Sequence, residues 1–165
     1  MNREQIKEKL TAKFGLEIIL AEVDFRDQLT LTVPRENIVE ICKFLRDEPE
    51  LGFDHLSFVC GVDRLPSEPR FEIVYQLYSH RNNRRFRIKV RLSEPAQGLP
   101  SIDSVVSVWS SADWHERETA EMYGIIFNNH PDPRRLLLAD HWTAHPLRKD
   151  FPLMGTEEAT SDLPA

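Results

Sequence analysis

The run FEIVYQLYSHRNNRRFRIKVRL, residues 71–92, decides the fold of this chain. Two apolar-rich segments flank Asn82-Asn83, and asparagine tolerates the left-handed backbone that tight hairpin turns require. Because side chains alternate between the two faces of a strand, a turn at these asparagines places three apolar pairs on one face: Ile73 with Leu92, Tyr75 with Val90, and Leu77 with Ile88. The run therefore predicts an antiparallel β-hairpin with one buried face.

The other face of the predicted hairpin carries four cations at two-residue spacing, Arg85, Arg87, Lys89 and Arg91. A solvated face is the first interpretation, because antiparallel sheets commonly leave one side in water. A docking surface for an acidic partner is the second. Nucleic-acid binding ranks third, since no exposed aromatic residues alternate with the cations and the chain has a formal net charge of −6.

Before the hairpin, periodicity predicts helix, strand, strand, helix, strand. The first helix carries Ile6, Leu10 and Phe14 on one face, with Asn2 as its N-cap and Gly15 at its end. The apolar run 17–25 and the alternating run 29–33 are typical of strands. The second helix begins near Pro34 and carries the apolar stripe Ile38, Ile41, Cys42 and Leu45. Residues 55–62 alternate again and predict a third strand.

After the hairpin, Ser101 can cap a short helix that carries Ile102, Val105, Val106 and Trp109. Ser111 or Asp113 can cap a longer helix over 114–123, with Gly124 in the left-handed position at its end. Residues 125–127 can form a last strand, and one helical turn is possible at 139–142. We therefore expect an α+β fold: a small mixed or antiparallel sheet flanked by helices, with a long irregular C-terminal interaction arm.

These patterns divide the chain into an α+β core over residues 1–127, an extended interaction segment of the same domain over 128–154, and a disordered acidic tail over 155–165. A length of 165 residues suits one domain with its own core. The sequence has no bilayer-spanning apolar run and no signal-peptide pattern. We therefore expect a cytoplasmic protein that reaches a membrane only through a partner.

Metal and cluster chemistry has little support. Cys42 and Cys60 form no CxxC, whereas clusters and structural zinc need about four thiolate or imidazole ligands. Reduced, buried thiols are therefore expected. The last third holds four histidines, His115, His130, His141 and His145, but without HExxH or a histidine pair in a helix a metal site is the weaker interpretation.

Acid–base and nucleophilic chemistry are also weak. Glu118 and Glu121 share a helix face, but the neighbouring arginines favour ion pairs that hold loops in place over proton transfer. Neither cysteine has a histidine nearby in sequence, GxSxG is absent, and the six glycines form no phosphate-binding loop. The residues thus indicate a charge-rich binding end without an active site.

Three blocks carry a family resemblance: WHERETAEMYGI at 114–125, HPDPRRLL at 130–137 and HPLRKDFP at 145–152. In this order they closely resemble the signature of the C subunit of respiratory complex I, the peripheral-arm subunit of bacterial NADH-quinone oxidoreductase that corresponds to the mitochondrial iron–sulfur protein 3. The resemblance covers most of residues 1–154. The positions that match the signature are Trp114, Glu116, Arg117, Glu118, Glu121, Tyr123, Gly124, His130, Pro131, Arg134, Arg135, His145, Pro146, Leu147, Arg148, Lys149, Asp150, Phe151 and Pro152.

The resemblance implies a non-catalytic subunit of a proton-translocating NADH-quinone oxidoreductase, which supports electron transfer from NADH to quinone by assembling and stabilising the quinone-reducing module. It implies no cofactor in this chain, with FMN and iron–sulfur clusters in partner subunits. The implied partners are the large subunit of the quinone site and the small subunit of the terminal cluster, on the cytoplasmic side of the cell inner membrane. The alternative is the equivalent subunit of a membrane-bound hydrogenase, or of a quinone reductase with another electron donor.

On this interpretation the matching charged residues order loops and contact partners, while Trp114, Tyr123, Trp142 and Phe151 serve as anchors, since aromatic residues and arginine dominate binding energy at interfaces. Pro146 and Pro152 would stiffen the arm and reduce the entropy lost when it lies across a neighbouring subunit.

Overall fold

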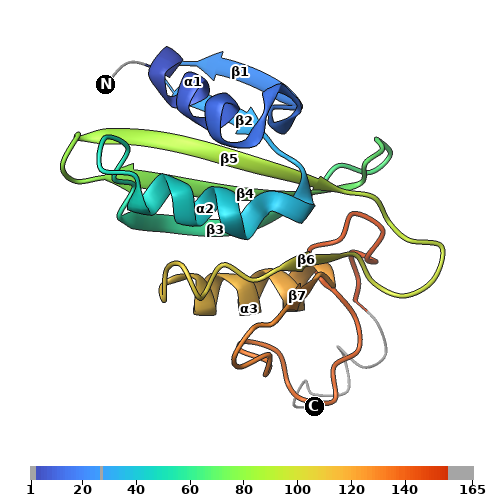
Figure 1. Ribbon diagram of the computed structural model, residues 1–165. Helices are drawn as coiled ribbons and strands as arrows, with labels where there is room; N and C mark the ends of the chain where they lie inside the picture. The colour runs from blue at the N-terminus through green and yellow to red at the C-terminus, as the bar shows by residue number, and fades with distance from the viewer. Residues whose placement is uncertain (1–2, 27, 156–165) are drawn as a thin grey trace.

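The computed structural model describes residues 3–26 and 28–155. Figure 1 shows its helices and strands: α1 (Arg3–Phe14), β1 (Ala21–Phe25), β2 (Gln28–Thr32), α2 (Ile38–Asp47), β3 (His55–Asp63), β4 (Phe71–Ser79), β5 (Arg84–Leu92), β6 (Ser101–Asp103), α3 (Ala112–Tyr123) and β7 (Ile126–Asn128). Two short 3₁₀ helices lie at Leu16–Ile18 and Arg35–Asn37. The N-cap predicted at Asn2 falls outside the described residues, and so does the tail predicted over 155–165, except for Gly155.

Five strands form one mixed sheet in the order β1-β2-β5-β4-β3. Neighbouring strands are antiparallel except β2 and β5, which are parallel, and β6 and β7 form a separate parallel pair. In Figure 1, α1 and α2 lie on one side of the sheet and α3 lies beyond β3, which it contacts. The predicted α+β class, with a mixed sheet flanked by helices, is confirmed.

The hydrophobic core lies between the sheet and these helices. Ile38, Ile41, Cys42 and Leu45 of α2 have no exposed surface, so the stripe predicted for the second helix is confirmed. The inward face of the hairpin, including Tyr75 and Ile88, is equally buried. Full burial of one large aliphatic side chain is worth roughly 1.5–3 kcal/mol, so this stripe is sufficient to hold α2 against the sheet.

The hairpin forms as predicted, but its register differs by two residues. Tyr75 pairs with Ile88 and not Val90, Ile73 pairs with Val90, and Leu77 pairs with Phe86. The turn is a four-residue loop over 80–83 in which only Asn83 is left-handed, at φ 48°. Asn82 instead donates its side-chain amide to the carbonyls of Glu50 and Leu51. Because the shift is an even number of residues, the same side chains still face the core.

Two other expectations differ from the structure, the first only at the beginning of a strand and the second throughout. Leu16–Ile18 is a 3₁₀ turn, and the strand predicted over 17–25 begins only at Ala21, since the chain must first cross from α1 to the sheet edge after Gly15. The helix predicted from Ser101 is absent, because Ser101–Asp103 pairs with β7 as strand β6. The possible helix over 139–142 is a single turn closed by Trp142 N–H donating to the Ala139 carbonyl.

Candidate interaction site in the C-terminal arm

The first signature block forms α3, and two of its acidic side chains point into the protein. Glu116 is fully buried and accepts hydrogen bonds from the Ser104 hydroxyl at 2.6 Å and the Val105 N–H at 2.8 Å. Burial raises the pKa of Glu116 to about 7, although these two hydrogen bonds act in the opposite direction. The side chain thus fixes the segment that leaves β6.

Glu121 fixes the beginning of the arm. Its buried carboxylate accepts three consecutive backbone N–H groups, from Leu136 at 3.2 Å and from Leu137 and Leu138 at 2.9 Å each. Backbone donors away from regular structure need such acceptors, so this carboxylate replaces a missing ladder of backbone hydrogen bonds. Glu118 is exposed, so the two side chains do not share an environment suited to an acid–base pair.

The second block is held by Arg117 and His130. Arg117 donates to the carbonyls of Arg134 at 2.9 Å and Arg135 at 3.0 Å, and its guanidinium lies 5.4 Å from the ring centre of Trp114. The Nδ1 atom of His130 accepts the Asp132 N–H at 3.1 Å. Its Nε2 then carries the proton and donates to the Asp113 carbonyl at 3.2 Å, as in a neutral imidazole.

The third block closes onto the end of α3. Arg148 donates to the Tyr123 carbonyl at 2.7 Å and the Gly124 carbonyl at 3.4 Å, the last acceptors of the helix. His145 hydrogen-bonds the Glu121 carbonyl through Nδ1 at 2.8 Å, and burial lowers the pKa of this imidazole. Gly124 has φ 65°, as predicted for a left-handed helix end, and its Cα faces the imidazole so closely that a Cβ there would collide with it.

A buried arginine outside the predicted set ties the arm to the sheet. The Arg70 guanidinium, 3% exposed, contacts Asp63 at 2.9 Å, Glu94 at 2.7 Å and Asp150 at 2.8 Å. The Lys149 N–H donates to Asp63 at 2.9 Å. The position of Arg70 offers a clue that the sequence analysis missed. Arg70 comes immediately before β4, and β4 pairs with β3 so that Phe71 lies opposite Asp63, the last residue of β3.

Large apolar side chains of α3 and the arm remain exposed beside charged ones. Trp114 is 63% exposed, and the exposed large apolar residues of the arm are Leu137, Leu147, Leu153 and Met154. Tyr123, Trp142 and Phe151 are half-buried, whereas Glu118, Pro131, Arg134, Lys149, Asp150 and Pro152 are exposed. We call Trp114, Leu137, Leu147, Leu153 and Met154 the apolar arm surface.

Two hollows are lined in part by residues of α3 and of the arm. One of about 800 Å³ is lined by Trp114, Arg117, Arg134 and Arg135 with three aspartates, Asp113, Asp132 and Asp140. The other, about 220 Å³, is mainly apolar and includes Leu99, Ile126 and Phe127 beside Glu116 and His130. In the described part of the chain, no group of three or more His, Cys, Asp or Glu side chains could hold a metal ion. No described helix is long and apolar enough to cross a membrane.

Residues 31–157, which include α2, the hairpin, α3 and the arm, match the family described as “Respiratory-chain NADH dehydrogenase, 30 Kd subunit”. The chain belongs to this family. The resemblance identified from the three blocks is therefore confirmed. The match begins within β2, so α1 and β1 of this 30 kDa-subunit homologue lie outside it.

Named relatives agree with the family, and each is a C subunit of NADH-quinone oxidoreductase. The one numbered 2 in Rhizobium meliloti (strain 1021) is 52% identical over 126 residues, covering 76% of this chain and 67% of the relative. The one from Roseiflexus sp. (strain RS-1) is 45% identical over 158 residues, covering 96% and 88%. The one from Geobacter metallireducens (strain ATCC 53774 / DSM 7210 / GS-15) is 48% identical over 148 residues, covering 89% and 88%.

A solved chain from the membrane-bound sulfane sulfur reductase, an archaeal respiratory membrane complex, has the same fold as this 30 kDa-subunit homologue. The TM-score is 0.73, the identity is 23%, and the match covers 92% of this chain and 86% of that one. At this identity the likeness supports the fold alone.

Proposed function

We propose that this chain is the non-catalytic C subunit of a proton-translocating NADH-quinone oxidoreductase, and that it supports electron transfer from NADH to quinone by assembling and stabilising the quinone-reducing module. The observation that carries the proposal is that the charged and the large apolar residues of the arm have different surroundings. Most of its charged signature residues contact other parts of this chain, while large apolar side chains remain exposed. This arrangement suits recognition of a partner better than chemistry.

The internal contacts make the arm ready to bind. An irregular segment that orders only on binding loses conformational freedom at that moment, which weakens the complex. Here the hydrogen bonds that Glu121 accepts from residues 136–138, together with the contacts of Arg148 and Arg70, already order the arm in the free chain. The residues of the apolar arm surface are then held in place before a partner binds, and Trp114 can serve as an aromatic anchor.

The partners we propose for this surface are the large subunit of the quinone site and the small subunit of the terminal cluster. FMN and the iron–sulfur clusters would reside in partner subunits, with none in this chain. The chain would lie on the cytoplasmic side of the inner membrane, attached through the complex. The equivalent subunit of a membrane-bound hydrogenase, or of a quinone reductase with another donor, is not favoured, because relatives at 45–52% identity carry the name NADH-quinone oxidoreductase.

The test replaces Trp114 and Leu147 with alanine and measures how much of the chain co-purifies with the intact complex, together with quinone reduction per assembled complex. Leu16→Ala is the matched control, because Leu16 is also exposed but lies far from the arm in sequence, between α1 and β1. We expect incorporation to fall for the arm variant alone, with normal turnover in complexes that still assemble. Normal incorporation with lost turnover would overturn the proposal and indicate a direct role in chemistry.

A further inference from the structure

The side of the sheet opposite α1 and α2 forms a second surface, which the proposed function does not use. Strand register identifies its side chains: one row across all five strands runs Val23, Thr30, Arg87, Gln76 and Phe58. Val23 and Phe25 of β1 are 58% and 64% exposed, which they would not be beneath a covering helix. We call this side the open face.

A strip of cations along β5 runs through the middle of the open face. Lys89 contacts Glu72 at 2.7 Å, and Arg91 lies 3.7 Å from the same carboxylate. Arg87 instead donates to the amide oxygens of Gln76 and Gln28, at 3.0 Å each, and both acceptors are neutral. Within the described part of the chain Arg85 forms no ion pair. Among the described strand residues, Glu72 is the only acidic one that register places on this face, so the strip is strongly cationic on a chain whose net charge is −6.

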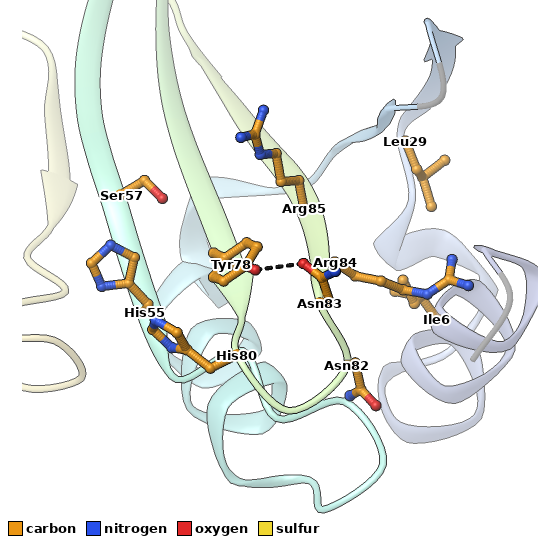
Figure 2. A pocket seen from close by; sticks show the side chains of 10 residues that line it. All are labelled: Ile6, Leu29, His55, Ser57, Tyr78, His80, Asn82, Asn83, Arg84 and Arg85. Atoms are coloured by element: carbon orange, nitrogen blue, oxygen red, sulfur yellow. Dashed lines mark hydrogen bonds between the residues drawn. The ribbon is translucent and has the colours of Figure 1, made fainter.

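The hairpin end of the strip adds aromatic groups. A hollow of about 890 Å³ lies there. Figure 2 shows His55, Tyr78 and Arg85 lining it from β3, β4 and β5, together with Leu29 and with Ile6 of α1, so the hollow extends beyond the open face. The Tyr78 hydroxyl donates to Asn83 at 2.6 Å, which fixes the ring beside the turn. The open face therefore combines a central row of positive charge with Val23 and Phe25 at one edge and Phe58 towards the other.

We propose that the open face binds an acidic segment of another subunit in the same complex. Alternate residues of a strand lie about 6.6 Å apart, and residues four apart in an α-helix lie about 6 Å apart. A partner helix with carboxylates at that spacing, or an extended segment with carboxylates at alternate positions, can therefore meet the cations of β5 in register. Its apolar neighbours would cover the exposed residues at the edges.

Charge selects this occupant over a second copy of the chain. In a two-fold symmetric pair of open faces the same patch meets itself, so the two β5 strips would lie against each other with like charges in contact. The aromatic groups are grouped at the hairpin end and do not alternate with the cations, unlike a platform on which successive bases stack.

Cross-linking in the purified complex tests the contact directly. With Arg85, Arg87 and Arg91 each replaced by lysine, a zero-length carbodiimide joins these amines to carboxylates in direct contact. We expect linked peptides between these positions and aspartate or glutamate of another subunit, and none from Lys43, the exposed control on α2. Links confined to this chain or to a second copy of it, or no links although the chain is present in the complex, would overturn the proposal. Absence of the chain from the complex would instead refute the proposed function.

Charge reversal provides an independent measurement. Arg85→Glu with Arg91→Glu should weaken retention of the chain in the complex about tenfold or more, so that it dissociates at lower NaCl concentration. Arg35→Glu with Lys43→Glu makes the same change in charge away from the open face and should leave retention unchanged. Equal loss in both pairs would contradict the proposal. Binding of the free chain to phosphatidylglycerol–phosphatidylcholine vesicles, abolished by the first pair alone, would overturn it in favour of a lipid surface.

Discussion

Replacing Arg70 with methionine tests whether buried charge holds the arm to the sheet. The substitution keeps an unbranched apolar stem but removes the cation between Asp63, Glu94 and Asp150. The Asp63 side chain, 1% exposed, would then be a buried carboxylate without a counter-charge. Leaving one member of a buried ion pair alone costs about 3–5 kcal/mol. We expect the free energy of unfolding to fall by about that amount.

Asp150→Asn is the matched comparison, because Asp150 contacts the same guanidinium but is 50% exposed. Solvent screens such a pair, so the expected loss is below about 1 kcal/mol. Urea denaturation of the full chain, followed by tryptophan fluorescence and extrapolated linearly to water, provides both values. Equal losses in the two variants, or a loss below about 1 kcal/mol for Arg70→Met, would refute the assignment of Arg70 as the buried anchor.

The pH dependence of stability provides a second measurement of the same network. Burial alone would raise the pKa of Asp63, but hydrogen bonds from Arg70 and from the Leu65 and Lys149 N–H groups lower it below its usual range. With a depressed folded-state pKa, the unfolded state binds more protons in acid. The stabilisation is therefore complete above the unfolded pKa of about 4 and is lost as pH falls below it. Asp63→Asn should lose less stability than the wild type over that acid range, and parallel curves would contradict this account.

Three further predictions concern α3 and the arm. The pKa of Glu116 in the folded chain is raised from 4.5 to about 7, so its contribution to stability is complete in acid and is lost as pH rises through this range. Between these pH values, the free energy of unfolding of Glu116→Gln, measured by urea denaturation, should fall by roughly 3 kcal/mol less than that of the wild type. Gly124→Ala should lower the free energy of unfolding more than Gly98→Ala, since both glycines are left-handed but only Gly124 faces a side chain. Arg148→Ala with Asp150→Ala should lower assembly of the complex and its quinone reductase activity together, and normal assembly with lost proton-transfer chemistry would indicate a catalytic role.

The elements that were predictable are those in which a local pattern and the tertiary environment agree. The stripe of α2 and the alternation of the hairpin each have one apolar face, and each face is buried. Ser101–Asp103 differs, because its strand exists through pairing with Ile126–Asn128, more than twenty residues later. The hairpin register moved for a similar reason: Asn82 is held by carbonyls of the segment between α2 and β3.

In the candidate site, too, the sequence identified residues but not their distant partners. Composition and motif identified Glu116, Glu121 and Arg148, but they could not identify the partners, which are backbone groups of distant loops. A backbone N–H or carbonyl has the same chemistry at every residue, so sequence carries no signal for which one a carboxylate or guanidinium will contact. The expected arginine–carboxylate pairs are present, as between Arg134 and Asp132 at 2.7 Å and between Arg148 and Glu94 at 3.1 Å. Arg117 and Arg148 also donate to backbone carbonyls, which the sequence did not indicate.

This choice of partners determines how the arm can be recognised. An irregular segment has many backbone donors and acceptors without a ladder, and each must find a partner or remain in water. Here Glu121 and Asp63 accept arm amides, and Arg148 and His145 bind carbonyls at the end of α3, so much of the polar content of the arm is directed inward. The exposed side chains include the large apolar residues Trp114, Leu137 and Leu147, and apolar area gives affinity with little demand on orientation. Substituting Glu121 or Arg148 should therefore disorder the arm in the free chain, measurable as faster amide exchange at 136–138. Substituting the exposed Leu147 should leave exchange unchanged and weaken only the complex.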